Sequence, residues 1–109
     1  MAALSAEPLT LQGAAGAYPV VIRAGALHDA LPAFVTDRGC SRVAVITNTT
    51  LASLYGEALT ARLPGGVLVT VPDGEQYKNL DTLQSMYAQL LAGGADRSTL
   101  IVALGGGVI

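Results

Sequence analysis

The segment Arg42-Val43-Ala44-Val45-Ile46-Thr47 decides the fold, because an unbroken apolar and β-branched run is typical of a strand buried on both faces of a parallel sheet. Two similar runs follow it, Val67-Leu68-Val69-Thr70-Val71 and Thr99-Leu100-Ile101-Val102-Ala103-Leu104. Between the runs, apolar residues recur at helical spacing, namely Leu51, Leu54, Tyr55, Ala58 and Leu59, and then Leu80, Leu83, Met86, Tyr87, Leu90 and Leu91. This alternation predicts an α/β fold: a Rossmann-like parallel sheet with flanking helices and right-handed crossovers.

The residues before this core predict an N-terminal β-hairpin. Leu9-Thr10-Leu11-Gln12 and Tyr18-Pro19-Val20-Val21-Ile22-Arg23 are typical of short strands, and the glycines and alanines between them favour a turn. Pro19 fits near the start of a strand, where its missing N–H does little harm.

Helix boundaries are predicted from caps and breakers. Helical spacing begins at Leu27, but Pro32 disfavours helical geometry at the residue before it, so a kink or two short pieces are expected before Gly39. Thr49 or Thr50 is available to cap the next helix. Asp81 and Gln84 resemble a capping box at the start of the last one.

The composition bounds the function. The chain has 109 residues, 51% of them hydrophobic and only 13% charged, which predicts one folded domain rather than a disordered segment. A net charge of −2 argues against nucleic-acid binding. No apolar run approaches the length of a membrane span, and the first residues do not resemble a signal peptide, so a cytoplasmic location is expected.

Cysteine and histidine each occur once. Cys40 has no partner for an internal disulfide, and together with His28 it is too little for a zinc site of three or four ligands. We expect Cys40 to pack in or near the core and His28 to be solvated. Any metal is therefore expected to be bound by residues outside this chain.

Three loops follow the three predicted strands of the sheet: Asn48-Thr49-Thr50, Asp73-Gly74-Glu75-Gln76-Tyr77-Lys78 and Gly105-Gly106-Gly107. In an open parallel sheet, ligands bind beyond the carboxyl ends of the strands. Glycines allow backbone N–H groups to approach a phosphate closely, although this triplet is not the G-x-G-x-x-G fingerprint. Together the loops predict a nucleotide site.

The polar side chains of these loops have both binding and structural interpretations. Glu75 has the chemistry to accept ribose hydroxyls, and Lys78 to place a charge near phosphate or a carbonyl oxygen. Asn48 and Thr50 suit an adenosine or ribose edge. Alternatively, Asn48 and Thr50 are only helix caps, and the 73–78 loop is only a turn before a helix, capped by Asp73 or Asn79. The glycine triplet then marks only a flexible strand exit.

The motifs Val71 through Lys78 and Leu100 through Ile109 resemble the N-terminal domain of 3-dehydroquinate synthase, in the sugar-phosphate cyclase superfamily. The resemblance extends back to Tyr18. It implies an enzyme that uses NAD and a divalent metal, zinc or cobalt, to convert 3-deoxy-D-arabino-heptulosonate 7-phosphate to 3-dehydroquinate and phosphate in the shikimate pathway. It also implies a small-molecule sugar-phosphate substrate, a homodimer, and no nucleic-acid or membrane partner.

Carried onto this sequence, the resemblance implies a set of NAD-binding residues: Asn48, Thr50, Asp73, Gly74, Glu75, Gln76, Tyr77, Lys78, Gly106, Gly107, Val108 and Ile109. It places no catalytic residue and no metal ligand in this chain. Residues 1–109 are interpreted as a truncated N-terminal NAD-binding domain without the C-terminal metal and substrate domain, and this chain alone is expected to be inactive. The alternatives are an aminodehydroquinate or cyclitol synthase, and a non-catalytic nucleotide-binding or assembly module.

Overall fold

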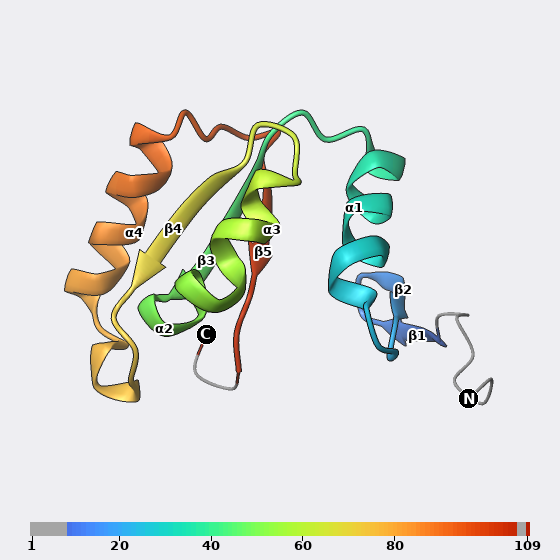
Figure 1. Cartoon of the computed structure of the whole chain (residues 1–109), viewed down its shortest axis with the longest axis horizontal. Coiled ribbons are helices and arrows are strands. Elements are labelled where there is room, and N and C mark those ends of the chain that lie inside the picture. Colours follow the sequence, from blue (N-terminus) through green and yellow to red (C-terminus); the bar gives the residue numbers. More distant parts are fainter. Residues whose placement is uncertain (1–8, 107–108) are drawn as a thin grey trace.

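The computed structural model describes residues 9–106 and 109. Its centre is a parallel sheet of β3 (Val43–Asn48), β4 (Val67–Val71) and β5 (Leu100–Ala103), arranged in the order β4-β3-β5 (Figure 1). All six residues of β3 are buried. The predicted α/β fold with a parallel sheet and flanking helices is confirmed.

The outer strands are less buried than the sequence predicted. In β4 only Val69 is fully buried, and in β5 half-buried residues alternate with exposed ones such as Ile101. Each of these strands pairs only with β3 within the described residues. The prediction of three fully buried strands is therefore wrong for β4 and β5, because an apolar run does not reveal which strand has neighbours on both sides.

The main hydrophobic cluster lies on one face of β3. Val43 and Val45 share that face because side chains alternate along a strand, and they pack with Val35, Leu59 and Leu63. Val35 comes from α1 (Ala26–Arg38), and Leu59 comes from α3 (Glu57–Ala61). The two helices are therefore anchored on the same central strand, and Cys40 packs against this cluster as expected.

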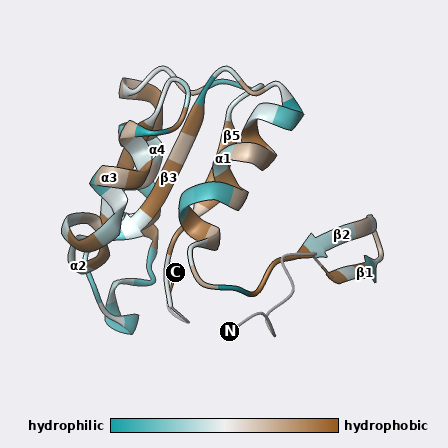
Figure 2. Cartoon of the chain, turned by 45° about the vertical axis from the view of Figure 1, so that its right-hand side comes forward, coloured by the Kyte–Doolittle hydropathy of each residue, from teal (hydrophilic) through white to brown (hydrophobic). Residues whose placement is uncertain are grey.

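The predicted hairpin is confirmed, with β1 (Leu9–Gly13) antiparallel to β2 (Gly16–Val20). Figure 2 shows it projecting to one side of the sheet. Every residue of β1 and β2 is exposed except Val20, which is half-buried. Pro19 pairs with Thr10 inside β2 rather than near its start.

Helix α1 is a single 13-residue helix that contains Pro32, so the prediction of two short pieces is wrong. Leu27 and Leu31, before the proline, and Val35, after it, all pack into the same cluster. Burial on both sides of Pro32 offsets the roughly 3 kcal/mol that an internal proline costs a helix. Gly39 ends the helix as predicted, in the left-handed conformation.

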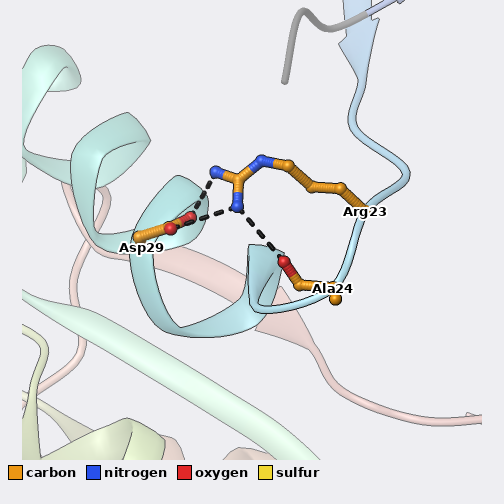
Figure 3. A network of polar contacts seen from close by, with 3 residues as sticks. All are labelled: Arg23, Ala24 and Asp29. Atoms are coloured by element: carbon orange, nitrogen blue, oxygen red, sulfur yellow. Dashed lines mark hydrogen bonds and ion pairs between the residues drawn. The ribbon is translucent and has the colours of Figure 1, made fainter. Parts of the chain in front are cut away.

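An ion pair ties the segment after the hairpin to the first turn of α1 (Figure 3). The guanidinium of Arg23 donates to both carboxylate oxygens of Asp29, one at 3.1 Å, and to the carbonyl oxygen of Ala24 at 3.4 Å. The hydrogen bonds from Arg23 are the main reason that the pKa of Asp29 is lowered. The pair fixes the start of a helix whose N-cap, Gly25, has no side chain to cap it.

The helical stretch after β3 consists of α2 (Thr49–Leu51), a π-helical turn η1 (Ala52–Gly56) and α3. Its N-cap is Asn48, because Asn48 still has extended backbone geometry while Thr49 and Thr50 are already helical. The alternative that Asn48 is a helix cap is confirmed, and capping by Thr49 or Thr50 is not found. The π-helical turn was not predicted.

The last helix, α4 (Leu80–Ala92), lies beside β4 (Figure 1). Asn79 caps it by accepting a hydrogen bond from the N–H of Thr82 at 2.9 Å. The alternative that Asn79 is a cap is therefore confirmed, and the predicted capping box of Asp81 and Gln84 is wrong. Gln89 forms two hydrogen bonds with the backbone of Thr70, as a neighbouring strand would. None of the helices in the described residues has the length and apolarity needed to cross a membrane.

Candidate functional site

The site begins at the carboxyl end of β3. Asn48 is only 7% exposed there, and its Oδ1 accepts a hydrogen bond from the N–H of Leu51 at 2.8 Å. Its Nδ2 lies 3.5 Å from Oδ1 of Asp73, in the loop that follows β4. Oδ2 of the same carboxylate accepts a hydrogen bond from the hydroxyl of Thr50 at 2.9 Å. Two of the three predicted loops are thus joined directly.

The loop after β4 has a fixed geometry of its own. Gly74 has φ +133° and ψ 147°, a backbone conformation that is largely restricted to glycine. The turn η2 (Glu75–Tyr77) follows it, and the N–H of Lys78 donates to the carbonyl oxygen of Glu75 at 3.1 Å. This turn presents Tyr77 and Lys78 on the side of the loop that faces α4.

A hollow of about 560 Å³ lies between these loops, the end of the sheet and α4. Its lining residues are Ile46, Asn48, Val71, Pro72, Gly74, Tyr77, Lys78, Asn79, Leu80, Thr82, Leu83, Met86 and Ile109. Residues from two of the three predicted loops therefore meet around one space, namely Asn48 from the first and Gly74, Tyr77 and Lys78 from the second. Ile109, beyond the glycine triplet, also lines the hollow, but Gly105 and Gly106 do not, so the convergence of all three loops is not confirmed for these glycines.

The other residues of the predicted NAD-binding set do not line the hollow or lie outside the described residues. Thr50, Asp73, Glu75, Gln76 and Gly106 are exposed and do not line the hollow. Gly107 and Val108 lie outside the described residues. The assignment of the whole set to NAD binding stays a prediction, and five of its members line the hollow.

Glycine at position 105 is explained by a close approach. The side chain of Ile109 occupies the place where a Cβ on Gly105 would be. Ile109 therefore lies against Gly105, and it also lines the hollow. Any larger residue at position 105 would push that wall aside.

Charge at the rim of the hollow is partly paired. Nζ of Lys78 lies 3.7 Å from Oε1 of Glu75, and both side chains are more than half exposed. Exposed pairs of this kind contribute little to stability, so Lys78 remains available to an anion. Among the described residues, no group of three or more histidine, cysteine, aspartate or glutamate side chains is arranged to hold a metal ion.

Sequence reasoning missed one wall of the site. Leu80, Leu83 and Met86 of α4 line the hollow, whereas their helical spacing was interpreted only as a core-facing stripe. Leu80 is 80% exposed, and no residue of α4 is fully buried. The available signal was the leucine placed immediately after the polar loop, at the end of the helix nearest the predicted ligand.

The hollow lies at the carboxyl ends of β3 and β4, and open parallel sheets bind their ligands beyond the carboxyl ends of the strands. The strand order reverses between β3 and β5, and no residue of β5 lines the hollow. Apolar walls with a few convergent polar groups (Asn48, Lys78, Asn79 and Thr82) are typical of sites for organic ligands.

Comparison with known proteins points to one family. The family model "3-dehydroquinate synthase N-terminal" matches residues 68–109. The chain is 40% identical over 108 residues to the 3-dehydroquinate synthase of Vibrio atlanticus (strain LGP32), covering 94% of this chain and 29% of that protein. It is 42% identical over 106 residues to that of Pelobacter propionicus, covering 93% of this chain and again 29% of the relative. The resemblance recognised in the sequence is confirmed: over nearly all its length, this chain is similar to the N-terminal part of 3-dehydroquinate synthases.

Proposed function

We propose that this chain is the NAD-binding part of a 3-dehydroquinate synthase. The complete enzyme would convert 3-deoxy-D-arabino-heptulosonate 7-phosphate to 3-dehydroquinate and phosphate. The observation that carries the proposal is the single hollow shared by the loops after β3 and β4, in a chain 40–42% identical to proteins of that name. Because the chain spans 29% of those relatives, turnover is assigned to the larger protein, and this chain alone is expected to be inactive.

The residues present fit a dinucleotide. Apolar side chains such as Val71, Leu83 and Met86 offer a surface for a planar ring. Asn48 and Lys78 supply a polar edge and a positive charge for ribose and phosphate oxygens. NAD, when bound, would accept a hydride from the substrate and return it later. The chain's own part would be to bind and orient the cofactor at the end of the sheet.

Metal binding is proposed to lie elsewhere. The family resemblance implies zinc or cobalt, but within residues 9–106 and 109 no suitable cluster of ligands is found. The metal ligands and the residues that hold the sugar phosphate are therefore assigned to the part of the relatives that this chain does not span.

Calorimetric titration of the chain with NAD tests the proposal. We expect saturable binding with a Kd on the order of 1 mM or tighter, which corresponds to about −4 kcal/mol. Lys78→Gln should weaken binding about tenfold, because it removes the positive charge at the rim. Arg97→Gln is the matched control, since Arg97 is an exposed cation that precedes β5, at the opposite end of the sheet. No saturable binding by the wild-type chain, or equal losses in both variants, would refute the proposed cofactor site.

A phosphate-release assay tests whether this chain alone can catalyse the reaction. The chain is mixed with 3-deoxy-D-arabino-heptulosonate 7-phosphate, NAD and cobalt. We expect no release above the background without protein. Clear turnover would show that residues of this chain suffice for the reaction, and the assignment of catalysis to a second part would be wrong.

A further inference from the structure

Each oxygen of the Asp73 carboxylate contacts a side chain at the β3 end of the site, and Asp73 does not line the hollow. One oxygen accepts from Thr50 at 2.9 Å, and the other lies 3.5 Å from the amide nitrogen of Asn48. Neither Asp73 nor Thr50 lines the hollow. The contacts join segments that are 23 and 25 residues apart in the sequence.

We propose that Thr50 and Asp73 form a latch that positions the 73–78 loop, and that they do not themselves contact the dinucleotide. This proposal differs from the sequence-based prediction, which assigns both residues to cofactor binding. The effect of the latch on affinity rests on the proposed function, whereas its effect on the loop does not.

The geometry of the loop explains why a latch is needed. Between Pro72 and Asn79, the loop is held by hydrogen bonds within its own turn, and Asp73 supplies its side-chain hydrogen bonds to the end of β3. Gly74, directly after Asp73, has the freedom to adopt many other backbone conformations. Fixing Asp73 selects the conformation in which Tyr77 and Lys78 face the hollow.

The charge of Asp73 supports a positioning role. A free carboxylate beside a pyrophosphate would repel it, since like charges at close range are unfavourable. Here the carboxylate accepts from a hydroxyl and is close to an amide of the β3 end. Asn48 contacts both α2 and the 73–78 loop, because its Oδ1 caps α2 while its Nδ2 points to Asp73.

Lys78 provides a way to observe the latch without any ligand. It is the only lysine in the sequence, so a lysine-specific endoprotease has one cleavage site, at the end of the latched loop. Cleavage of a folded protein requires local opening, and its rate follows the population of the open form when opening is fast. Loss of one hydrogen bond worth about 1 kcal/mol should raise that population roughly fivefold.

The experiment is a double-mutant cycle with Thr50→Val and Asp73→Ala. Each single variant should be cleaved about fivefold faster than wild type, and the double variant no faster than the quicker single variant. Asp73→Asn should be cleaved more slowly than Asp73→Ala but faster than wild type, because its amide oxygen still accepts from Thr50 while its NH2 group cannot accept from Nδ2 of Asn48. Thr49→Val is the control, since no hydrogen bond of the Thr49 side chain is found in the described part of the chain, and it should leave the rate unchanged.

The same variants are then titrated with NAD. Thr50→Val and Asp73→Ala should weaken binding by non-additive factors, and Asp73→Asn should restore it in part, since its amide oxygen can still accept from Thr50. Unchanged cleavage in the single variants, or additive effects on cleavage, would overturn the latch. A direct contact between Asp73 and the cofactor would instead appear as lost affinity in Asp73→Asn with no effect of Thr50→Val, and would also overturn the inference. Failure of the wild type to bind NAD would refute the proposed function and leave the cleavage result standing.

Discussion

Strand β3 and the hairpin of β1 and β2 are built from similar apolar residues, yet they lie in opposite environments. Every residue of β3 is buried between two neighbouring strands and the helices that cover them. In the hairpin, Leu9 is 60% exposed and Leu11 is 46% exposed. Apolar side chains stabilise a fold only to the extent that they leave water, so the free energy of folding is concentrated around β3.

The largest expected effect comes from making the same substitution in the two regions. Leu59→Ala removes a side chain that is 3% exposed in the cluster on β3, and should lower the free energy of unfolding by about 2–5 kcal/mol. Leu11→Ala, in the hairpin, should change it by no more than about 0.5 kcal/mol. Urea unfolding followed by circular dichroism measures both. Equal losses of unfolding free energy in the two variants would mean that Leu11 is buried in solution. The contrast between a buried β3 and an exposed hairpin would then be wrong.

A smaller loss of stability is expected from a substitution at the outer edge of β4, where hydrogen bonds from a side chain take the place of those from a neighbouring strand. Gln89 donates to the carbonyl oxygen of Thr70 at 2.9 Å and accepts from its N–H at 3.1 Å. Gln89→Ala should cost about 1–2 kcal/mol, because it leaves two half-buried backbone groups without these partners. It should also speed hydrogen exchange of the Thr70 amide.

Gln84→Ala is the control for the edge of β4, since Gln84 is an exposed residue of the same helix. Both variants remove the same side chain from α4 and have the same helix propensity. A difference in stability between them therefore reports the contacts of Gln89, which are those with Thr70 and one with the hydroxyl of Ser85 at 3.2 Å, and exchange of the Thr70 amide singles out the contact with Thr70. If the Thr70 amide exchanges equally fast in both, Gln89 does not protect the edge.

Much of the fold could be predicted from the sequence because its signals are local. The β-branched runs predicted the strands of the sheet, and Gly39 marked the end of α1 where the structure has it. Two of the three strand-end loops were also placed correctly at one site, since strands of a parallel sheet end at the same edge. Asn48 and Lys78 do line one hollow.

The rest could not be predicted, because it depends on neighbours in space. Whether β5 is a central or an edge strand depends on which strands pair with it, and the apolar sequence of Leu100–Ala103 is compatible with both positions. The choice of Asn48 over Thr50 as a cap depends on where the extended backbone ends, which shifts by a residue or two between similar sequences. The role of Asp73 depends on a contact with Thr50 across 23 residues, for which the sequence carries no periodic signal.

The smallest change in stability is expected between the hairpin and α1, where Arg23 forms an ion pair with Asp29. The pKa of Asp29 is lowered in the folded chain from its ordinary value of 3.8, mainly by hydrogen bonds from Arg23. A carboxylate with a lowered pKa stabilises the fold above its unfolded-state pKa, and this contribution is lost as the pH falls through the lowered value. Wild type should therefore be more stable than Asp29→Asn near pH 7, and the difference should shrink below about pH 4. Urea unfolding across this range measures it, and Arg23→Gln should remove the same pH-dependent difference because it removes the partner. A gap between wild type and Asp29→Asn that stays constant from pH 7 to pH 2 would show that the ion pair does not join the hairpin segment to α1 in solution.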